Sequence, residues 1–517
     1  MAGNGLPNPS EHGSHKPSSV QRTFGLVLFL VGLAVFTGVL LVGDYQLDNQ
    51  KLINLQGSIP ADRLAKLESL NNRLFTSKNT FLRAVAGTIN DDGKVQPYQL
   101  QQYQISILKA ASIGYLTDHP GRVFLASLVL ALAGAFIFIL AGLREQPGIK
   151  NNHIFFSSTM YRGAIGIITG AYLIGFYVLL YWFPEYVVNM IILADPVSFA
   201  LRNLPADRWF LYGTLYTLAV SVMGIRMSIK YRHSRYHLVR TSSVIFFQFA
   251  LAWLLPSIMD RLGQPSMDLK NAWPLNYSFF MDWNLTTLLN SGYFGMFLLF
   301  WGMVLSLVAV PVLTYFFGKR WYCSWVCGCG GLAETVGDPF RQLSDKSLKA
   351  WQVERWLVHS VLVFAVVMTI MQIANFLSDG ALFSNYTWRV NQWYSFAIGS
   401  AFAGVIGTGF YPLMGNRVWC RFGCPLAAIL GIVQKFKSRF VITTNGGQCI
   451  SCGNCSTYCE MGIDVRWYAQ REQNIIRASC VGCGVCAAVC PRGVLRLENG
   501  DPNKRYNVVL EDEILGK

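Results

Sequence analysis

The segment CVGCGVCAAVCP, from Cys480 to Pro491, decides the architecture of the C-terminal part of this chain. Its four thiols follow the spacing C-x2-C-x2-C-x3-C, and a proline comes directly after the last of them. An earlier segment, CISCGNCSTYC, repeats this spacing from Cys449 to Cys459, at an offset of 31 residues (480 minus 449). The repeat indicates an internal duplication.

This spacing is typical of bacterial ferredoxins with two 4Fe-4S clusters, in which three thiolates come from one loop and the fourth comes from the other copy. The rule assigns Cys449, Cys452, Cys455 and Cys490 to one cluster and Cys480, Cys483, Cys486 and Cys459 to the other. The glycines of CGNC and CGVC suit such loops, because glycine accepts positive φ and lets amide groups approach a cluster. Zinc fits less well, since zinc sites commonly use thiol pairs or histidine and no histidine follows His359.

One position departs from the ferredoxin signature. Glu460 follows the last thiol of the first copy, where the second copy has Pro491. The departure removes no ligand. An acidic group beside a cluster is expected to lower the reduction potential of that cluster.

The composition of the whole chain indicates a membrane protein. Of its 517 residues, 52% are hydrophobic and only 14% are charged, which excludes an ordinary soluble enzyme. The formal net charge is +15, but the basic residues lie mostly beside apolar stretches, where they set orientation and do not indicate nucleic-acid binding. All 13 cysteines lie at or beyond Cys323.

Apolar runs long enough to cross a bilayer predict eight transmembrane helices, because hydrocarbon leaves no backbone group unpaired outside a helix. The predicted spans are Phe24–Val42, Val123–Leu143, Ala164–Phe183, Phe210–Met227, Ser243–Ile258, Gly292–Phe317, Trp356–Phe376 and Tyr394–Met414. Lys and Arg are dense in the connections MSIKYRHSRYHLVR, FFGKRWYC and MGNRVWCRFGCP, which places these on the cytoplasmic side. We therefore expect a multi-pass protein of the bacterial inner (cytoplasmic) membrane with a cytoplasmic ferredoxin domain.

The resulting fold class is a polytopic α-helical membrane protein with a C-terminal α+β ferredoxin domain of the bacterial two-cluster type. Its predicted parts are a flexible cytoplasmic N-terminus (1–22), a transmembrane helix (23–43), an external helical segment (44–121), a transmembrane bundle (122–436) and the ferredoxin-like domain (437–517). In the external segment, apolar positions at helical spacing predict a helical hairpin or cap. It serves either as a packing element or as a docking surface for an external partner.

A second set of thiols lies beside the predicted spans. RWYCSWVCGCG contains Cys323 and Cys327, RVWCRFGCPLA contains Cys420 and Cys424, and both read R-x-x-C-x-x-x-C. The i to i+4 spacing predicts that each pair shares one helical face, so that the four thiols converge on a further metal centre at the cytoplasmic boundary. Thiol redox chemistry and a structural role are the alternatives. Cys329 has no counterpart in the second copy.

Other chemistry is missing or ambiguous in the sequence. There is no C-x-x-C-H, no G-x-G-x-x-G opening a strand-to-helix unit and no phosphate loop, so neither a c-type haem nor a nucleotide site is predicted. Electrons must then come from a quinol or from another protein. Glu334 and Asp338 follow the first thiol motif. They are candidate proton acceptors for quinol oxidation, or else helix-capping or surface groups.

The combination of two C-x-x-x-C motifs, the second continuing as Cys424–Pro425, with a two-cluster ferredoxin resembles the NapH/NosR family of membrane-bound iron-sulfur electron-transfer proteins. The resemblance covers roughly Gly292 to Leu497, with Gly328 where the family usually has proline. It implies electron transfer between the quinone pool and a redox partner protein, as a component of a quinol-linked oxidoreductase complex. The related CcoG-type accessory proteins imply the alternative of a redox or copper maturation factor for a respiratory enzyme, for which the soft ligand Cys329 is the sequence feature.

Overall fold

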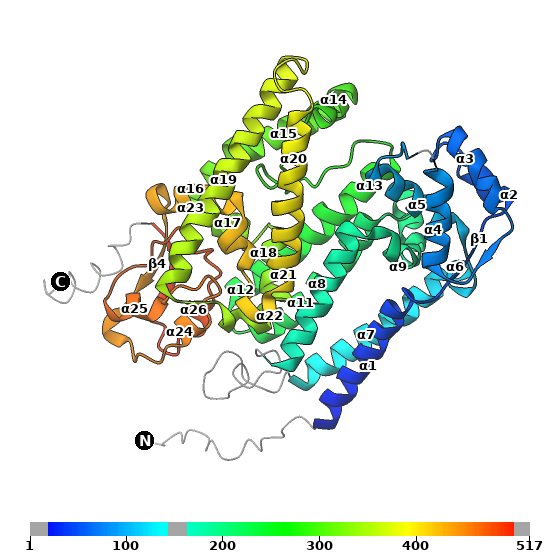
Figure 1. The fold of residues 1–517 in the computed structure, drawn as a ribbon. Helices are drawn as coiled ribbons and strands as arrows, with labels where there is room; N and C mark the ends of the chain where they lie inside the picture. The colour runs from blue at the N-terminus through cyan, green and yellow to red at the C-terminus, as the bar shows by residue number, and fades with distance from the viewer. Residues whose placement is uncertain (1–18, 92, 143–162, 501–517) are drawn as a thin grey trace, which may run out of the picture. The chain divides into compact units, whose positions relative to one another are not determined.

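The computed structural model describes residues 19–91, 93–142 and 163–500, and these fold mostly into helices with two small sheets (Figure 1). They form two compact units, which are described separately. The first comprises Met1–Gln146 and Val188–Pro196, and the second comprises Pro147–Val187 and Val197–Lys517. Most of the predicted flexible N-terminus, residues 1–18, lies outside the described residues.

Two long apolar helices and a small α/β cap make up the first unit. Its helices and strands are α1 (Ser19–Gly38), β1 (Asp44–Gln46), α2 (Asn49–Asn54), α3 (Ala61–Leu67), η1 (Glu68–Leu70), β2 (Leu74–Phe75), α4 (Lys78–Ile89), α5 (Pro97–Ala111), β3 (Ser112–Ile113), α6 (Tyr115–Asp118), α7 (Pro120–Gly142) and α9 (Val188–Leu193). The strands form an antiparallel sheet in the order β2-β1-β3. Segment 44–121, for which a helical hairpin or cap is predicted, thus forms a cap of short helices with a small sheet.

The core of this cap explains the apolar pattern of the sequence. Leu67, Leu70, Phe81 and Val85 are buried together, as their helical spacing predicts, whereas Leu74 lies on strand β2 and is 59% exposed. The helical pattern stops at Leu74 because the chain pairs there with β1.

Close packing of α1 against α7 depends on glycines at the contact. A Cβ at Gly25 would lie 2.7 Å from the backbone N of Phe138, and one at Gly134 would collide with the backbone N of Phe29. The helices thus approach to backbone contact, as small residues allow between apolar helices.

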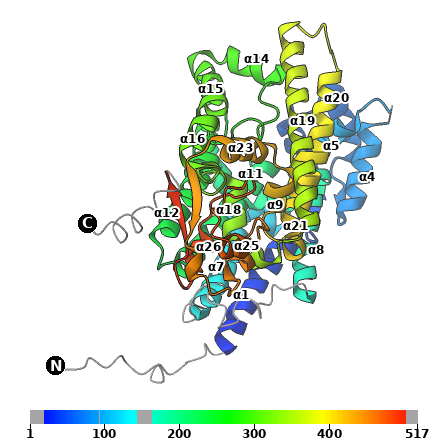
Figure 2. The same ribbon diagram turned by 90° about the vertical axis from the view of Figure 1, so that its left-hand side faces the viewer.

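The second unit contains the remaining helices and both sets of thiols. Its helical bundle consists of α8 (Ala164–Trp182), η3 (Pro184–Val187), α11 (Arg208–Lys230), α12 (Arg235–Phe246), the π-helical η4 (Phe247–Leu254), α13 (Leu255–Arg261), α14 (Asp282–Asn290), α15 (Gly292–Val304), the π-helical η5 (Leu305–Ala309), α16 (Val310–Phe317), α17 (Arg320–Cys323), α18 (Gly328–Thr335), η6 (Asp338–Leu343), α19 (Leu348–Leu377), α20 (Tyr386–Tyr394), the π-helical η7 (Ser395–Ile406), α21 (Gly407–Gly409), α22 (Tyr411–Met414), the π-helical η8 (Trp419–Gly423) and α23 (Pro425–Lys437). A further helix, α10 (Asp195–Arg202), crosses the boundary between the two units. Figures 1 and 2 show α19 and α20 side by side.

Within the described residues, six helices are long and apolar enough to cross a membrane. They are Val20–Gly38, Pro120–Ala141, Arg208–Lys230, Arg235–Arg261, Gly292–Phe317 and Leu348–Leu377. A seventh candidate, Gly166–Trp182, qualifies only together with the next helix, from which a sharp bend separates it. The predicted span Tyr394–Met414 is interrupted at Phe410, two residues before Pro412. Six candidate spans are therefore confirmed, and the count of eight stays a prediction.

A compact module follows α23, drawn in orange and red in Figure 1. Its elements are β4 (Phe440–Thr444), η9 (Gly446–Gln448), α24 (Asn454–Thr457), α25 (Val465–Gln470), α26 (Val485–Ala488) and β5 (Leu495–Asn499). Strands β4 and β5 pair antiparallel, with Phe440 opposite Asn499 and Thr444 opposite Leu495. Both cysteine repeats lie between these two strands, so the sheet closes the module.

Replacing Gly134 by alanine is expected to destabilise the first unit by about 1–3 kcal/mol, because a methyl group overpacks the contact of α7 with α1. Thermal unfolding of the detergent-solubilised protein measures the effect. Gly38→Ala is the matched control, since a Cβ at Gly38 would meet nothing within 4 Å. Equal melting temperatures for the two variants would contradict the packing argument.

Candidate iron-sulfur and thiol sites

The two cysteine repeats adopt the same local backbone conformation. Gly453 (φ 78°) and Gly484 (φ 80°) both precede a short helix, α24 or α26, in the left-handed conformation. Cys455 and Cys486 lie in the first turns of these helices. The positive φ expected for the glycines of CGNC and CGVC is confirmed, because only glycine adopts it without strain.

One pocket of the module is lined by thiols from both repeats. Cys449, Cys452 and Cys455 of the first copy meet Cys490 of the second, with Ile450, Arg466 and Arg492 at the rim. We call these four thiols the outer cluster site. The set is the one assigned from spacing, and four convergent thiols in a pocket fit a 4Fe-4S cluster.

The remaining four thiols form a second, more deeply buried group, which we call the docked cluster site: Cys459, Cys480, Cys483 and Cys486. Burial, followed by the neighbouring Cys483, Cys480 and Cys459, raises the pKa of the Cys486 thiol. The Gly482 N–H donates to Cys480 Sγ at 3.4 Å, and the Ile463 N–H donates to Cys459 Sγ at 3.4 Å. A bound metal is what holds such buried thiols as thiolates.

Side chains of the helical bundle bind the backbone of the loop 477–483, which leads into the docked site. The carbonyl groups of this loop accept hydrogen bonds from Gln434 (to Arg477 at 2.8 Å and Cys480 at 2.7 Å), Lys319 (to Ala478 at 3.4 Å), Ser324 (to Val481 at 2.8 Å), Tyr236 (to Gly482 at 2.8 Å) and Arg240 (to Cys483). The docked site therefore faces the bundle, and Ser324 is the neighbour of Cys323.

Each C-x-x-x-C motif is interrupted by a helix break, which corrects the expectation of one shared helical face. Cys323 ends α17 and Cys420 lies in η8, whereas Cys327 and Cys424 are the N-cap residues of α18 and α23. Cys424 Sγ accepts a hydrogen bond from the Ala427 N–H at 3.4 Å. The break follows from the capping geometry, since a residue in extended conformation cannot continue the preceding turn.

The structure nevertheless brings the four membrane thiols together, through the fold and not through the helix repeat. Cys420, Cys323 and Cys327 are, after burial, the groups that raise the pKa of Cys424. A guanidinium nitrogen of Arg417, Nη1, links the two motifs, lying 3.5 Å from Cys420 Sγ and 3.2 Å from the Cys323 carbonyl oxygen. We call Cys323, Cys327, Cys420 and Cys424 the membrane thiol site.

Cys329 belongs to the same neighbourhood. The neighbouring Cys329 thiol, together with the Gly330 N–H and the Lys270 ammonium group, lowers the pKa of Cys327. Cys327 thus has the chemical character of a thiolate ligand.

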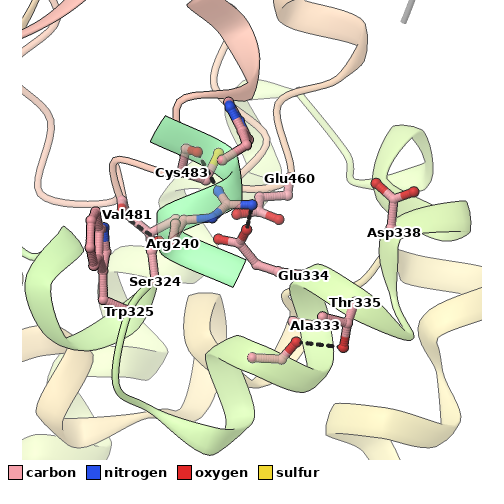
Figure 3. Close-up of polar contacts among 12 residues, drawn as sticks. Arg240, Ser324, Trp325, Ala333, Glu334, Thr335, Asp338, Glu460, Val481 and Cys483 are labelled. Atoms are coloured by element: carbon pink, nitrogen blue, oxygen red, sulfur yellow. Dashed lines mark hydrogen bonds and ion pairs between the residues drawn. The ribbon is translucent and has the colours of Figure 1, made fainter. Parts of the chain in front are cut away.

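A continuous chain of ion pairs lies between the bundle and the docked site. In order, its members are Arg226 and Lys230, both paired with Asp338, then Arg341, Glu460, Arg417, Glu334 and Arg240. We call it the ion chain. Figure 3 shows Arg240, Glu334 and Glu460 beside Cys483.

Sequence reasoning did not find this chain and misjudged two of its members. Glu334 and Asp338, for which a surface or capping role was an alternative, are each only 2% exposed. Burial opposes ionisation of Asp338, but Lys230, Arg341 and Arg226 outweigh it and hold its pKa well below its usual range. For Glu334 burial dominates, and its pKa is raised despite Arg240 and Arg417.

Glu460 is also part of the chain, which changes the meaning of its departure from the ferredoxin signature. Its carboxylate lies 2.6 Å from Arg341 and 3.1 Å from Arg417. The charge is therefore balanced by two buried guanidinium groups and is not left facing a cluster alone. Oxygen atoms of Glu334 and Glu460 and the sulfur of Cys483 lie within 4.8 Å of one another, but arginines already occupy both carboxylates.

Comparison with known families identifies the iron-sulfur regions. The family described as "4Fe-4S binding domain" matches residues 299–347 and 396–443, and the "4Fe-4S dicluster domain" family matches residues 420–495. The first family covers both membrane thiol motifs and the second covers both ferredoxin repeats. The presence of 4Fe-4S ferredoxin-type domains is thus confirmed. No solved structure matches the chain significantly.

Two curated relatives share part of this sequence. The "Putative electron transport protein YccM" of Escherichia coli (strain K12) is 26% identical over 169 residues, which is 31% of this chain and 47% of the relative. The "Methylamine utilization ferredoxin-type protein MauN" of Methylobacillus flagellatus is 26% identical over 157 residues, 29% of this chain and 52% of the relative. The chain spans about half the length of the relatives it matches, and the narrower resemblance to the NapH/NosR family stays a prediction.

The variant Asp338→Asn is expected to destabilise the second unit by about 3–5 kcal/mol, because it leaves buried cations without their partner. Since the pKa of Asp338 is lowered on folding, its stabilising contribution is present above the ordinary carboxyl pKa of about 4 and is lost as the pH falls below it. Protease resistance measured from pH 7 to pH 3 checks both effects. Asp379→Asn, in an exposed turn, is the control and should change nothing.

Proposed function

We propose that this chain is a membrane-bound electron-transfer protein that connects a membrane redox reaction to a protein partner through two 4Fe-4S clusters. The observation that carries the proposal is the contact between the docked site and the membrane thiol site. Ser324, next to Cys323, donates to the Val481 carbonyl oxygen at 2.8 Å, and Arg417 contacts both Cys420 Sγ and the Glu460 carboxylate. Two thiol sites that are joined by direct hydrogen bonds and an ion pair are suited to pass electrons between them.

The cysteine residues have distinct roles in this proposal. Cys449, Cys452, Cys455 and Cys490 hold the outer cluster, and Cys459, Cys480, Cys483 and Cys486 hold the docked cluster. When bound, the clusters supply one-electron carriers, which the protein positions and shields from water. The outer site opens to the surface, where exposed Ile450 and Arg492 surround it, and is the place at which a soluble partner gains access.

The placement in the cell is part of the proposal. We propose that the candidate spans lie among lipids of the bacterial inner membrane and that the ferredoxin domain, 437–517, faces the cytoplasm, which the basic residues beside the thiol motifs support. The bundle, 122–436, carries the membrane thiol site, and the segment 44–121 is external. Quinol is the proposed membrane reductant, because the sequence has no nucleotide-binding motif.

The membrane thiol site is proposed to hold a further metal centre. The four thiols of the two motifs are buried in one cluster, and Arg417 contacts one of them, Cys420. Two others, Cys327 and Cys424, cap helices of eight or more residues, where the helix dipole favours a thiolate. Replacing one of these thiols by serine removes a ligand of the proposed further centre and leaves all eight cysteines of the ferredoxin repeats in place.

A second candidate function is a redox or copper maturation factor for a respiratory enzyme. The position of Cys329 beside Cys327 favours this candidate, since a fifth thiol enlarges a soft donor set of the kind that binds Cu(I).

The variant Cys483→Ser tests the assignment of the docked cluster. Anaerobically purified protein should contain about eight irons per chain for two clusters, and the variant should retain about half of the iron and of the visible absorbance. Cys329→Ser, outside both repeats, is the matched control and should keep the full absorbance of the ferredoxin clusters. Undiminished absorbance in Cys483→Ser would exclude this residue as a ligand.

Titration with Cu(I) separates the two candidate functions. An electron carrier is expected to show no tight copper site that depends on Cys323, Cys327 and Cys329, so the wild type and the triple serine variant should titrate alike. Tight binding that disappears in the triple variant, measured by competition with a Cu(I) chelator, would favour the maturation factor.

A further inference from the structure

The ion chain is charged unevenly, and its excess is positive. It contains five cations (Arg226, Lys230, Arg240, Arg341, Arg417) and three anions (Glu334, Asp338, Glu460), which leaves two positive charges. Arg240, Arg341 and Arg417 are each only 1% exposed, so water does not screen them. A buried excess of charge needs a counter-charge nearby.

The docked site supplies that counter-charge at short range. Arg341 Nη1 lies 4.0 Å from Cys483 Sγ, and Arg240 donates to the carbonyl oxygen of the same residue. A 4Fe-4S cluster in the 2+ state held by four thiolates would carry two negative charges, opposite in sign to the formal excess of the chain. Reduction adds one more negative charge and is therefore favoured by these cations.

The outer site has no comparable surroundings. The charged side chains that line it besides its thiols are Arg466 and Arg492, and both are exposed to solvent. Water screens these charges, so their effect on a cluster is small. Two sites with the same ligand spacing thus differ in the charges fixed around them.

We propose that the ion chain tunes the docked cluster selectively, with Arg341 raising and Glu460 lowering its reduction potential while the outer cluster stays insensitive to both. The inference rests on the proposed function, because it requires both clusters. Arg341 and Glu460 are positioning residues that act through Cys483 and its cluster. The asymmetry gives two carriers with equal ligands different potentials. Each carrier takes up or releases one electron between the 2+ and 1+ levels, without making or breaking a bond.

A redox titration of the full-length protein in detergent, followed by EPR with dithionite as reductant, tests this proposal. Arg341→Gln removes a cation and should move one of the two reduction waves to lower potential. Glu460→Gln removes an anion and should move the same wave to higher potential, while the other wave stays in place in both variants. General loosening of the module does not produce shifts of opposite sign.

Two further variants serve as controls. Arg341→Lys keeps the charge and should leave both waves near their wild-type positions, and Arg466→Gln, at the outer site, should leave the docked wave unmoved. Should neither Arg341→Gln nor Glu460→Gln retain its clusters, Arg226→Gln decides: it removes a cation at the partly exposed end of the ion chain and should move the docked wave to lower potential.

The outcomes separate this inference from the function on which it rests. In one outcome, the wild-type protein has about eight irons and two waves, and neither wave moves in Glu460→Gln. This result overturns the tuning role and leaves the electron-transfer function standing. Shifts of the same sign in Arg341→Gln and Glu460→Gln, or equal shifts of both waves, also overturn it. A single wave that accounts for two spins per chain means equal potentials and also overturns the tuning role, whereas wild-type protein that binds no 4Fe-4S cluster overturns the proposed function itself.

Discussion

The carboxylate of Glu460, held between Arg341 and Arg417, is the interaction on which the second unit of this protein depends. The three side chains are at most 1% exposed, the Asn416 amide also donates to the carboxylate, and the Ser344 hydroxyl donates to the Glu460 backbone carbonyl oxygen. A buried carboxylate without its charged partners would be strongly destabilising, so the contact between the ferredoxin module and the bundle is what stabilises this charge. Through this contact the docked site and the membrane thiol site both lie against the ion chain.

The two R-x-x-C-x-x-x-C motifs have diverged in what their arginines contact. Arg320 and Arg417 occupy the same place in the two R-x-x-C-x-x-x-C motifs. Arg320 stacks over Phe440 at 4.5 Å and donates to Asn499, on the two strands that close the module. Arg417 lies in the ion chain. Both arginines hold the module, one through its sheet and one through Glu460, so a repeated sequence performs two different tasks.

The ferredoxin repeats have diverged in the same sense. The position after the fourth thiol is Glu460 in one copy and the exposed Pro491 in the other. The proline suits a loop at the surface, whereas the glutamate lies where the module meets the bundle. The glutamate that departs from the ferredoxin signature therefore marks the side of the module that is buried, and the conventional Pro491 marks the side open to solvent.

The sequence by itself determined the features that depend on neighbours along the chain. Thiol spacing predicted the ferredoxin repeats and their positive-φ glycines, and apolar length predicted the candidate spans, because both are local properties. Only the tertiary structure decided which charges meet, since Arg341 and Glu460 are 119 residues apart and Arg417 and Glu334 are 83 apart. It also decided the break within each C-x-x-x-C motif, where helix capping overrides the i to i+4 spacing. Pairing of buried charges is set by desolvation in three dimensions, and no periodicity in the sequence records it.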